Sequence, residues 1–325
     1  MKKRLLFCSE SSHLSTGYAV YTREILKRLY ATNKYELLEY ANYGHDTDNK
    51  PPWHFVGVLP NNEQEAQIYQ SSMMNEFGAY KFEPTCLKFR PDAVFNFTDF
   101  WMQAHILTSP YRRYFKYIAM PTVDCDPQQE EWISGYKNTD HLFTYSKWAQ
   151  DLLEKQCPNF LNLVGQASPA ADYDVFKPVP NKREHKQRLG IHPDSFIIGT
   201  VMRNQKRKLY PSLIEAFEKL DLANSYLYLH TKWPDMGWDL PYFIKNSTVS
   251  HRILVTYFCK NCKTIYPSHF QGGVCTCKNC GEYSAVMPGS SDGIPTEALA
   301  SIMNVFDVYA QYSTCFVAGT EILTS

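Results

Sequence analysis

The sequence predicts an α/β protein with two successive domains, each built on a parallel β-sheet that is covered by helices. Short apolar runs alternate with helix-patterned segments over residues 4–156, and the alternation starts again after residue 180. Between them lies QASPAADYDVFKPVP (166–180), which is rich in Pro, Ala and Asp and has no periodicity. A chain of 325 residues is also longer than one hydrophobic core usually supports. We therefore expect one domain over residues 1–165 and another over residues 166–314.

The first domain contains five segments with an expected strand, in the order RLLFCS (4–9), YELLEYAN (35–42), RPDAVFNFTD (90–99), KYIAMPTVDCDP (116–127) and DHLFTYS (140–146). The strand in the third segment is expected to end at Thr98 or Asp99, and the strand in the fourth runs into a Pro-bounded loop. After the first segment, STGYAVYTREILKRLYATN (15–33) predicts a turn and then a helix with an apolar stripe. After the last, KWAQDLLEKQ (147–156) predicts a helix that is capped by Ser146. This alternation indicates a parallel sheet with helices on both faces.

The second domain repeats the pattern and is expected to be Rossmann-like, as is the first. Its strands are expected in SFIIGTVMRN (195–204), SYLYLHT (225–231), HRILVTY (251–257) and NVFDVYAQYS (304–313). Its helices are expected in REHKQRLGI (183–191), YPSLIEAFEKL (210–220) and GIPTEALASIMN (293–304). Ligands of such folds bind at the carboxyl ends of the strands, in the cleft expected between two such domains. The residues that directly follow strands are therefore the candidates for a functional site.

Composition excludes several classes of protein. The 33 basic residues balance the 33 acidic ones, which argues against a strongly basic nucleic-acid-binding domain and makes nucleic acid an improbable partner. No apolar run approaches the roughly 18 residues of a membrane span, and LLF after MKKR is too short for a signal peptide. The 10 cysteines do not indicate a disulfide scaffold in so long a chain. We expect a reducing, cytoplasmic location.

The segment GTVMRNQKRKLYPSLIEAF (199–217) places two cations between a strand and a helix. Arg203 comes directly after the strand, and Lys208 follows five residues later, just before the helix begins. Fixed cations and the N–H groups of a helix N-terminus both favour an anion, so the segment predicts a diphosphate site. The alternative is that RNQKRK is a solvated basic turn.

Four cysteines in CKNCKTIYPSHFQGGVCTCKNC (259–280) have the spacing of a metal site. Cys259 and Cys262 form one Cys-x2-Cys pair, Cys277 and Cys280 form another, and fourteen residues separate them. This spacing predicts a tetrahedral four-thiolate zinc site. Because the protein would fill all four positions, the zinc would be structural and not catalytic. The alternative is four unrelated free thiols.

We interpret residues 257–283 as a zinc ribbon inserted between the strand HRILVTY and the helix GIPTEALASIMN. Cys275 is a fifth thiol that would compete as a ligand, and His269 is expected to be a surface loop residue. The ribbon would hold its own loop or contact an acceptor or a partner. It is only modestly basic, so contact with nucleic acid ranks low.

Together, DYDVFKPV, RLGI and SFIIGTVMRNQKRKLYPSLIEAF resemble the second domain of GT-B glycosyltransferases of the retaining family 4, also called glycosyl transferases group 1. That family has a DxxxFxP-like segment, then a strand that ends in Arg, then a Lys a few residues later. The resemblance runs from about residue 4 to residue 314, with the ribbon as one insertion. It implies that Arg203 and Lys208 hold the diphosphate of a nucleotide-sugar donor and stabilise the leaving nucleotide. The donor base, the sugar and the acceptor stay open (UDP-, GDP- or ADP-sugar).

The resemblance extends to the first domain with one departure. STGYAVYTREIL is similar to the family's glycine-containing loop after the first strand, where Gly17 would let the backbone approach the donor phosphates. The alternative is an ordinary turn glycine. In MPTVDCDP, Asp124 stands where many family members carry a His near the reacting sugar. Asp124 would orient a sugar hydroxyl or the acceptor, or it would only cap the following turn.

The resemblance stops at Ser313–Thr314, before the family's two Glu residues and its last strand and helix units, so the second domain is expected to be incomplete. Residues 315–325, CFVAGTEILTS, resemble instead the start of an intein, with Cys315 as its nucleophile. The Cys315 thiol would attack the carbonyl of Thr314 and turn that amide into a thioester. The alternative is a coincidental apolar tail.

Three functions follow from these interpretations. The first is a retaining glycosyltransferase, interrupted by an intein and inactive in this fragment alone. The second is a catalytically inactive scaffold with the same fold that docks through its zinc ribbon. The third is half of a protein-splicing precursor, whose partner would be a complementary intein or C-terminal fragment.

Overall fold

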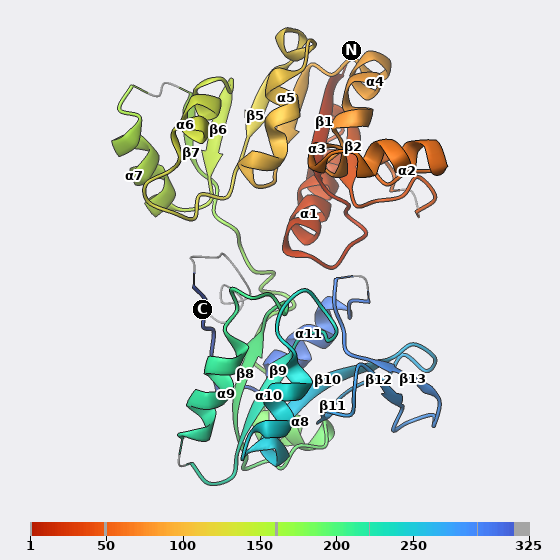
Figure 1. The fold of residues 1–325 in the computed structure, drawn as a ribbon, viewed down its shortest axis with the longest axis vertical. Coiled ribbons are helices and arrows are strands. Elements are labelled where there is room, and N and C mark those ends of the chain that lie inside the picture. The colour runs from red at the N-terminus through yellow and green to blue at the C-terminus, as the bar shows by residue number, and fades with distance from the viewer. Residues whose placement is uncertain (1, 49–50, 160–161, 221, 291, 315–325) are drawn as a thin grey trace. The chain divides into compact units, whose positions relative to one another are not determined.

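The computed structural model describes residues 2–48, 51–159, 162–220, 222–290 and 292–314. It separates into two units, Met1–Pro169 and Ala170–Ser325 (Figure 1). Each unit contains one β-sheet with its own helices, and each is described by itself below.

The first unit contains a seven-stranded sheet in the order β3-β2-β1-β4-β5-β6-β7, and every neighbouring pair is parallel. The interior strand β1 is buried over Leu6–Ser9, as its continuous apolar run requires of a strand covered on both faces. The strands are β1 (Lys3–Glu10), β2 (Tyr35–Asn42), β3 (His54–Gly57), β4 (Ala93–Asn96), β5 (Lys116–Ala119), β6 (His141–Thr144) and β7 (Leu163–Gln166).

Helices follow most of these strands. They are α1 (Gly17–Ala31), α2 (Glu63–Gln70), α3 (Met73–Glu76), α4 (Ala79–Phe89), α5 (Ala104–Thr108), α6 (Glu130–Lys137) and α7 (Lys147–Gln156), with short 3₁₀ turns at Phe100–Gln103 and Arg112–Tyr114. Ser146 caps α7 as predicted, because its hydroxyl accepts a hydrogen bond from the Ala149 N–H. Thr16 caps α1 in the same way.

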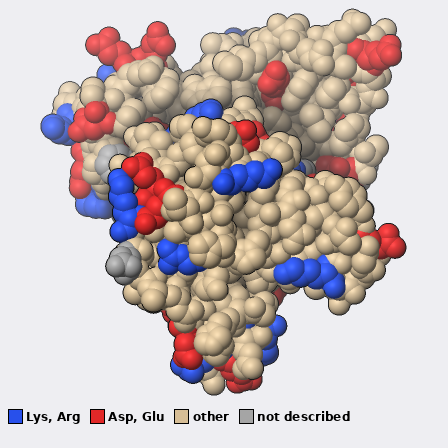
Figure 2. Space-filling model, turned by 60° about the horizontal axis from the view of Figure 1, so that its bottom comes forward, with Lys and Arg blue, Asp and Glu red and all other residues tan. Residues whose placement is uncertain are grey.

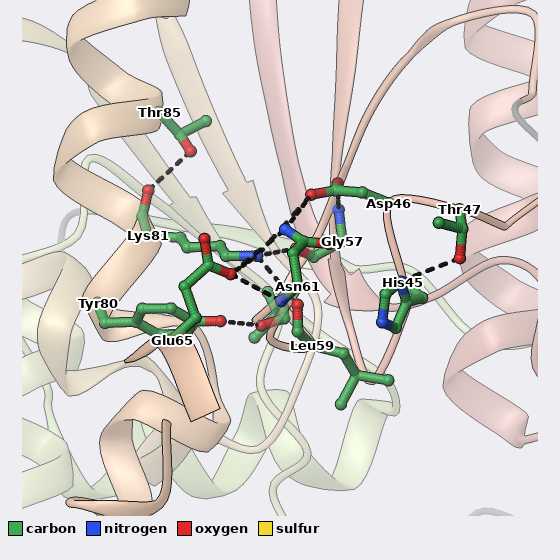
Figure 3. Close-up of polar contacts among 12 residues, drawn as sticks. His45, Asp46, Thr47, Gly57, Leu59, Asn61, Glu65, Tyr80, Lys81 and Thr85 are labelled. Atoms are coloured by element: carbon green, nitrogen blue, oxygen red, sulfur yellow. Dashed lines mark hydrogen bonds and ion pairs between the residues drawn. The ribbon is translucent and has the colours of Figure 1, made fainter. Parts of the chain in front are cut away.

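The edge strand β3 is fastened to α4 by a polar cluster around Lys81 (Figure 3). The Lys81 ammonium donates to the carbonyl oxygens of Gly57 and Leu59, at 3.0 Å each, and forms an ion pair with Glu65 at 3.2 Å. Asp46 accepts a hydrogen bond from the Gly57 N–H at 2.7 Å. Backbone groups at the end of this edge strand are therefore satisfied within the unit, which protects them from pairing with another chain.

The second unit contains a mixed sheet in the order β12-β13-β10-β9-β8-β14, with β11 paired to β10. Its parallel part is β8 (Phe196–Val201), β9 (Ser225–His230), β10 (Ile253–Cys259) and β14 (Val308–Tyr309). The antiparallel part is β11 (Ile265–His269), β12 (Val274–Thr276) and β13 (Tyr283–Val286). The predicted fold class is confirmed. The antiparallel strands β11 and β12 lie within the cysteine-rich segment 259–280, and β13 follows it directly. Figure 1 shows β12 and β13 at the end of the sheet away from α9.

The helices of the second unit are α8 (Lys182–Arg188), α9 (Tyr210–Glu218), α10 (Leu240–Asn246) and α11 (Thr296–Met303), with a 3₁₀ turn at Ser250–Arg252. The strand expected over 304–313 is only two residues long. The preceding residues are used in the turn that ends α11, where the Phe306 N–H donates to the Met303 carbonyl at 3.0 Å. The Asp307 carboxylate then accepts from the Ile197 N–H at 2.8 Å, so the strand begins only at Val308.

Candidate functional site

Four cysteine sulfurs meet at one point of the second unit. Cys259 ends β10 and Cys262 lies in the turn after it, while Cys277 and Cys280 lie between β12 and β13. The four Sγ atoms all lie within 4.8 Å of one another, with 3.6 Å between Cys259 and Cys280 and 3.7 Å between Cys262 and Cys277. Zinc–sulfur bonds of about 2.3 Å in a tetrahedron place the sulfurs roughly 3.8 Å apart. The arrangement therefore fits a four-thiolate zinc site.

Hydrogen-bond donors surround these sulfurs. The Cys262 N–H points at the Cys259 sulfur, and the Asn279 N–H points at the Cys277 sulfur, both at 3.4 Å. The side-chain hydrogen bonds with Thr264 and then Asn279 lower the pKa of the Cys262 thiol to about 5. With that pKa the Cys262 thiol is charged at neutral pH, and the thiolate is the form that binds a metal. The backbone hydrogen bond with Glu282 alone would lower the pKa of the Cys280 thiol, but desolvation and the hydrogen bonds with Cys259 and Cys262 raise it, so this ligand would release its proton on binding the metal.

Two further residues that the sequence placed near this cluster lie outside it. Cys275 is buried in the apolar core of the second unit, and burial raises the pKa of its thiol. It does not belong to the group of four converging sulfurs. The His269 Nδ1 atom lies 3.1 Å from the Ile253 carbonyl oxygen, so this imidazole contacts the backbone of β10.

The basic loop (residues 202–209) connects β8 to α9 and carries both cations of the expected diphosphate site. The Arg203 guanidinium pairs with both carboxylate oxygens of Asp235, with Nε–Oδ2 and Nη2–Oδ1 distances of 3.1 Å each. Lys208 is buried, and its backbone forms an isolated antiparallel bridge with Ser313. The structure therefore brings Arg203 and Lys208 into one short loop at the start of a helix. Sequence reasoning missed Asp235.

Two features bear on ligand binding, one in this loop and one at Ser313, which is bridged to it. Leu209, which precedes α9, supplies no side-chain cap to the helix. Of the first two helical residues, Tyr210 donates its N–H to the Lys208 carbonyl at 2.8 Å and Pro211 has no N–H, so Ser212 is the first whose N–H could face a ligand. The Ser313 hydroxyl is buried and has no hydrogen-bond partner among the residues that the structure describes. A buried polar group without a partner is costly, and a bound ligand is one way to satisfy it.

The segment after β9, residues 231–238, packs directly on the basic loop, and we call it the bridging loop. The Asn204 side-chain amide donates to the Trp238 carbonyl at 2.8 Å and accepts from the Trp238 N–H at 2.9 Å. The Trp238 indole N–H donates to the Lys208 carbonyl at 2.9 Å. A Cβ atom on Gly237 would lie 2.5 Å from the Asn204 backbone, so glycine is needed there. These contacts fix the two loops to each other.

In the first unit, Gly17 is the first residue of α1. A Cβ atom added there would meet nothing within 4 Å among the described atoms, and its backbone is not left-handed. Neither packing nor conformation within the unit requires a glycine at this position. Asp124 lies half-buried in the loop after β5, beside the exposed Cys125.

Polar side chains missed by the sequence reasoning gather at the carboxyl ends of β1, β4 and β5. The Tyr18 hydroxyl donates to Asp99 at 2.7 Å and lies 2.5 Å from the Thr122 hydroxyl oxygen. Burial, and then the charge of Asp99, raise the pKa of Tyr18, so its hydroxyl stays protonated. The sequence signal was available for Asp99, which lies at the end of the predicted strand in RPDAVFNFTD (90–99).

A buried carboxylate organises the loop between β1 and α1. Glu39 of β2 accepts hydrogen bonds from the Ser12 N–H at 2.7 Å and the Ser12 hydroxyl at 2.9 Å. It also accepts from the Trp53 indole at 2.7 Å, and it is fully buried. Glu39 thus holds the start of the loop that leads to Gly17.

The face drawn in Figure 2 carries charges of both signs, and basic and acidic side chains lie next to one another on it. That face presents no broad patch of one sign on which a polyanion would dock. Within the described ranges, no helix has the length and hydrophobicity needed to span a bilayer. Cys315 and the rest of the intein-like segment lie outside the described residues, so that interpretation stays a prediction.

Comparison with known proteins finds similarity in fold but not in sequence. No protein-family model matches the chain, and no curated protein matches it. Sucrose-phosphate synthase from Thermosynechococcus elongatus matches with a TM-score of 0.62 and 12% identity, over 95% of this chain and 75% of that one. HepE from Anabaena, in a complex with UDP-glucose, matches with a TM-score of 0.60 and 13% identity, over 96% and 74%. A glycosyltransferase from Rickettsia africae matches with a TM-score of 0.59 and 14% identity, over 96% and 73%.

These matches define the class of fold. The chain has the architecture of GT-B glycosyltransferases, in which two α/β units follow each other in one chain. Identities of 12–14% show the fold alone, and function has to be argued from the site.

Proposed function

We propose that this chain is a glycosyltransferase of the retaining family 4 type, which binds a nucleotide-sugar donor and transfers its sugar to an acceptor. The observation that carries the proposal is the basic loop: Arg203 and Lys208 lie between β8 and the start of α9 in a GT-B fold. In open α/β sheets this edge is where ligands bind, and a helix N-terminus with fixed cations suits a diphosphate.

Among the residues assigned to the donor phosphates, Arg203 has the best-defined geometry. Its pairing with both oxygens of Asp235 holds the planar guanidinium in one orientation. A cation fixed in this way would stabilise the negative charge that develops on the leaving nucleotide without first having to reorganise. Lys208 would add its charge from a buried position, where the electrostatic effect of a cation is stronger than in water.

The proposal also gives roles to Gly17, Asp124 and the four cysteines. Gly17 would let the backbone of its loop approach the donor phosphates, and Asp124 would orient a sugar hydroxyl or the acceptor. Zinc bound by Cys259, Cys262, Cys277 and Cys280 would be structural. Since HepE was solved with UDP-glucose, UDP is the first nucleotide to test.

The test is the affinity for UDP, GDP and ADP, measured by isothermal titration calorimetry on the zinc-loaded chain. We expect one of them to bind, and Arg203→Ala to weaken it by roughly 10- to 100-fold, the usual value of charge-assisted hydrogen bonds. Arg183→Ala is the matched control, because Arg183 also pairs with an aspartate, Asp194, on the surface of the same unit. It should leave the affinity unchanged.

Two results would count against the proposal. Equal affinity in Arg203→Ala and the parent protein would remove the phosphate assignment. A folded, zinc-loaded protein that binds none of the three nucleotides would favour the scaffold that docks through its ribbon.

A further inference from the structure

The ribbon (residues 257–283) does not stand apart from the rest of the second unit. Its residues Cys259, Cys275 and Cys277 belong to the same buried cluster as Leu213 of α9 and Leu240 of α10. The metal cluster is therefore built into the core that also supports the helix after the basic loop.

One side of the bridging loop is held by the ribbon through packing. The Trp233 ring meets the Phe270 ring edge-on, with 5.8 Å between the centroids. A Cβ atom on Gly273 would lie 2.9 Å from the Trp233 carbonyl oxygen and 3.2 Å from the Pro234 ring, so the two backbones meet with no room for a methyl group. A shift of the ribbon at Gly273 would therefore displace the bridging loop.

The same side is also held through charge. Lys260, inside the first Cys-x2-Cys pair, forms an ion pair with Asp292 at 2.9 Å. Asp292 also pairs with Lys232 of the bridging loop at 3.6 Å. The aliphatic stem of Lys232 lies against Gly289, where a Cβ atom would come within 2.2 Å of it. Asp292 thus links the metal-binding turn to the bridging loop.

The other side of the bridging loop holds the basic loop, through Asp235 on Arg203 and through Trp238 on Asn204 and Lys208. The Lys206 ammonium also lies 4.4 Å from the centroid of the Trp238 ring. The bridging loop is therefore clamped on one side by the ribbon and on the other by the residues proposed to bind the donor diphosphate.

We infer that the four-cysteine ribbon positions the basic loop, with Asp292 and Asp235 as positioning residues that act through the bridging loop. A four-thiolate site stabilises its ribbon only while the metal is bound, so loss of the metal loosens Lys260 and Phe270 first. The bridging loop then loses its contacts with the ribbon, and Arg203 loses the fixed position of Asp235. By linkage, an anion bound at Arg203 strengthens metal retention to the same degree. This inference rests on the proposed function only in naming that anion a diphosphate.

The test uses Asp292→Asn, which removes both ion pairs and keeps all four cysteines. Hydrogen exchange of the amides in residues 203–208 and 231–238 is compared with that of the parent, with zinc content checked by native mass spectrometry. We expect exchange in both segments to rise roughly two- to fivefold, the factor that a partly exposed ion pair supplies, with one zinc retained. Asp292→Glu should restore much of the protection. Asp194→Asn, which breaks another surface ion pair of the same unit, should change neither segment.

Inorganic pyrophosphate then serves as the anion probe in calorimetry. Weaker pyrophosphate binding in Asp292→Asn, restored by Asp292→Glu, supports the inference and the diphosphate site together. Faster exchange in a protein that binds no pyrophosphate at all supports the positioning and removes the diphosphate site. Unchanged exchange in both segments, in Asp292→Asn and after removal of zinc by a chelator, overturns the inference whether or not pyrophosphate binds.

Discussion

Glu39 is a buried carboxylate whose oxygens accept three hydrogen bonds, two from Ser12 and one from Trp53. Glu39→Gln keeps the volume but turns an amide NH₂ toward groups that are themselves donors. We expect this change to lower the free energy of unfolding by about 1–3 kcal/mol, the usual cost of leaving buried polar groups unpaired. Urea denaturation of the full chain measures the change.

Glu36→Gln is the control for that measurement. Glu36 lies on the same strand, but its side chain is 46% exposed and its partner is the exposed His54. Its replacement should change the free energy of unfolding by no more than about 0.5 kcal/mol. Equal losses in the two variants would show that Glu39 has no special role in holding the loop before Gly17.

At the scale of elements, Asp140 joins β5 to the start of β6. Its carboxylate accepts hydrogen bonds from Lys116 at 2.8 Å, from the Tyr117 N–H at 2.9 Å and from Arg112 at 2.7 Å. Burial alone would raise its pKa, but the hydrogen bond from Lys116, followed by those from Tyr117 and Arg112, outweighs burial and lowers the pKa to about 2. The charged carboxylate is therefore the stabilising form.

The direction of the pH dependence follows from that lowered pKa. The stabilisation by Asp140 is complete above its ordinary pKa of 3.8 and is lost as the pH falls toward 2. Asp140→Asn should cost about 2 kcal/mol at pH 7 and much less at pH 2.5. Urea denaturation at both pH values checks this, with the exposed Asp151→Asn as control. A loss for Asp140→Asn that is equal at the two pH values would contradict the account.

Two cysteines of the ribbon, only two residues apart in the sequence, test which thiols bind the metal. Cys277→Ser removes one of the four converging sulfurs, while Cys275→Ser changes a buried thiol outside the cluster. We expect the parent and Cys275→Ser to carry one zinc per chain, and Cys277→Ser to bind zinc at least about tenfold more weakly. Zinc content after dialysis, measured by native mass spectrometry, distinguishes them. Zinc loss from both variants would show that Cys275 is also a ligand.

Most of the strands and helices that local sequence patterns predicted are present in the structure. The segment YELLEYAN became β2 with the same bounds, and KWAQDLLEKQ became α7. By contrast, no element was predicted between residues 43 and 89, where β3 and three helices lie. β3 is short and depends on Lys81 from α4, a contact that no local period reveals. β14 was predicted too long. The Asp307 carboxylate accepts a hydrogen bond from the Ile197 N–H of β8, and the strand begins only after this residue.

At the scale of the whole molecule, the candidate sites also differ in whether local sequence or tertiary contacts determine them. The four cysteines could be found from spacing because their geometry is set within 22 residues. Asp235 could not be found from spacing, because its role depends on a tertiary contact. β9 lies next to β8, so the loops that follow the two strands share one edge of the sheet and Asp235 reaches Arg203. Tyr18 and Thr122 meet for the same reason in the first unit.

The central claim is that a GT-B fold holds a donor diphosphate at the basic loop. The most direct measurement is a crystal structure of the zinc-loaded protein soaked with the nucleotide that binds best in calorimetry. We predict diphosphate density against the Arg203 guanidinium and the N-terminus of α9, with the Ser313 hydroxyl in contact with the ligand. Density for a bound nucleotide elsewhere, with no contact between its phosphates and Arg203, would contradict the claim.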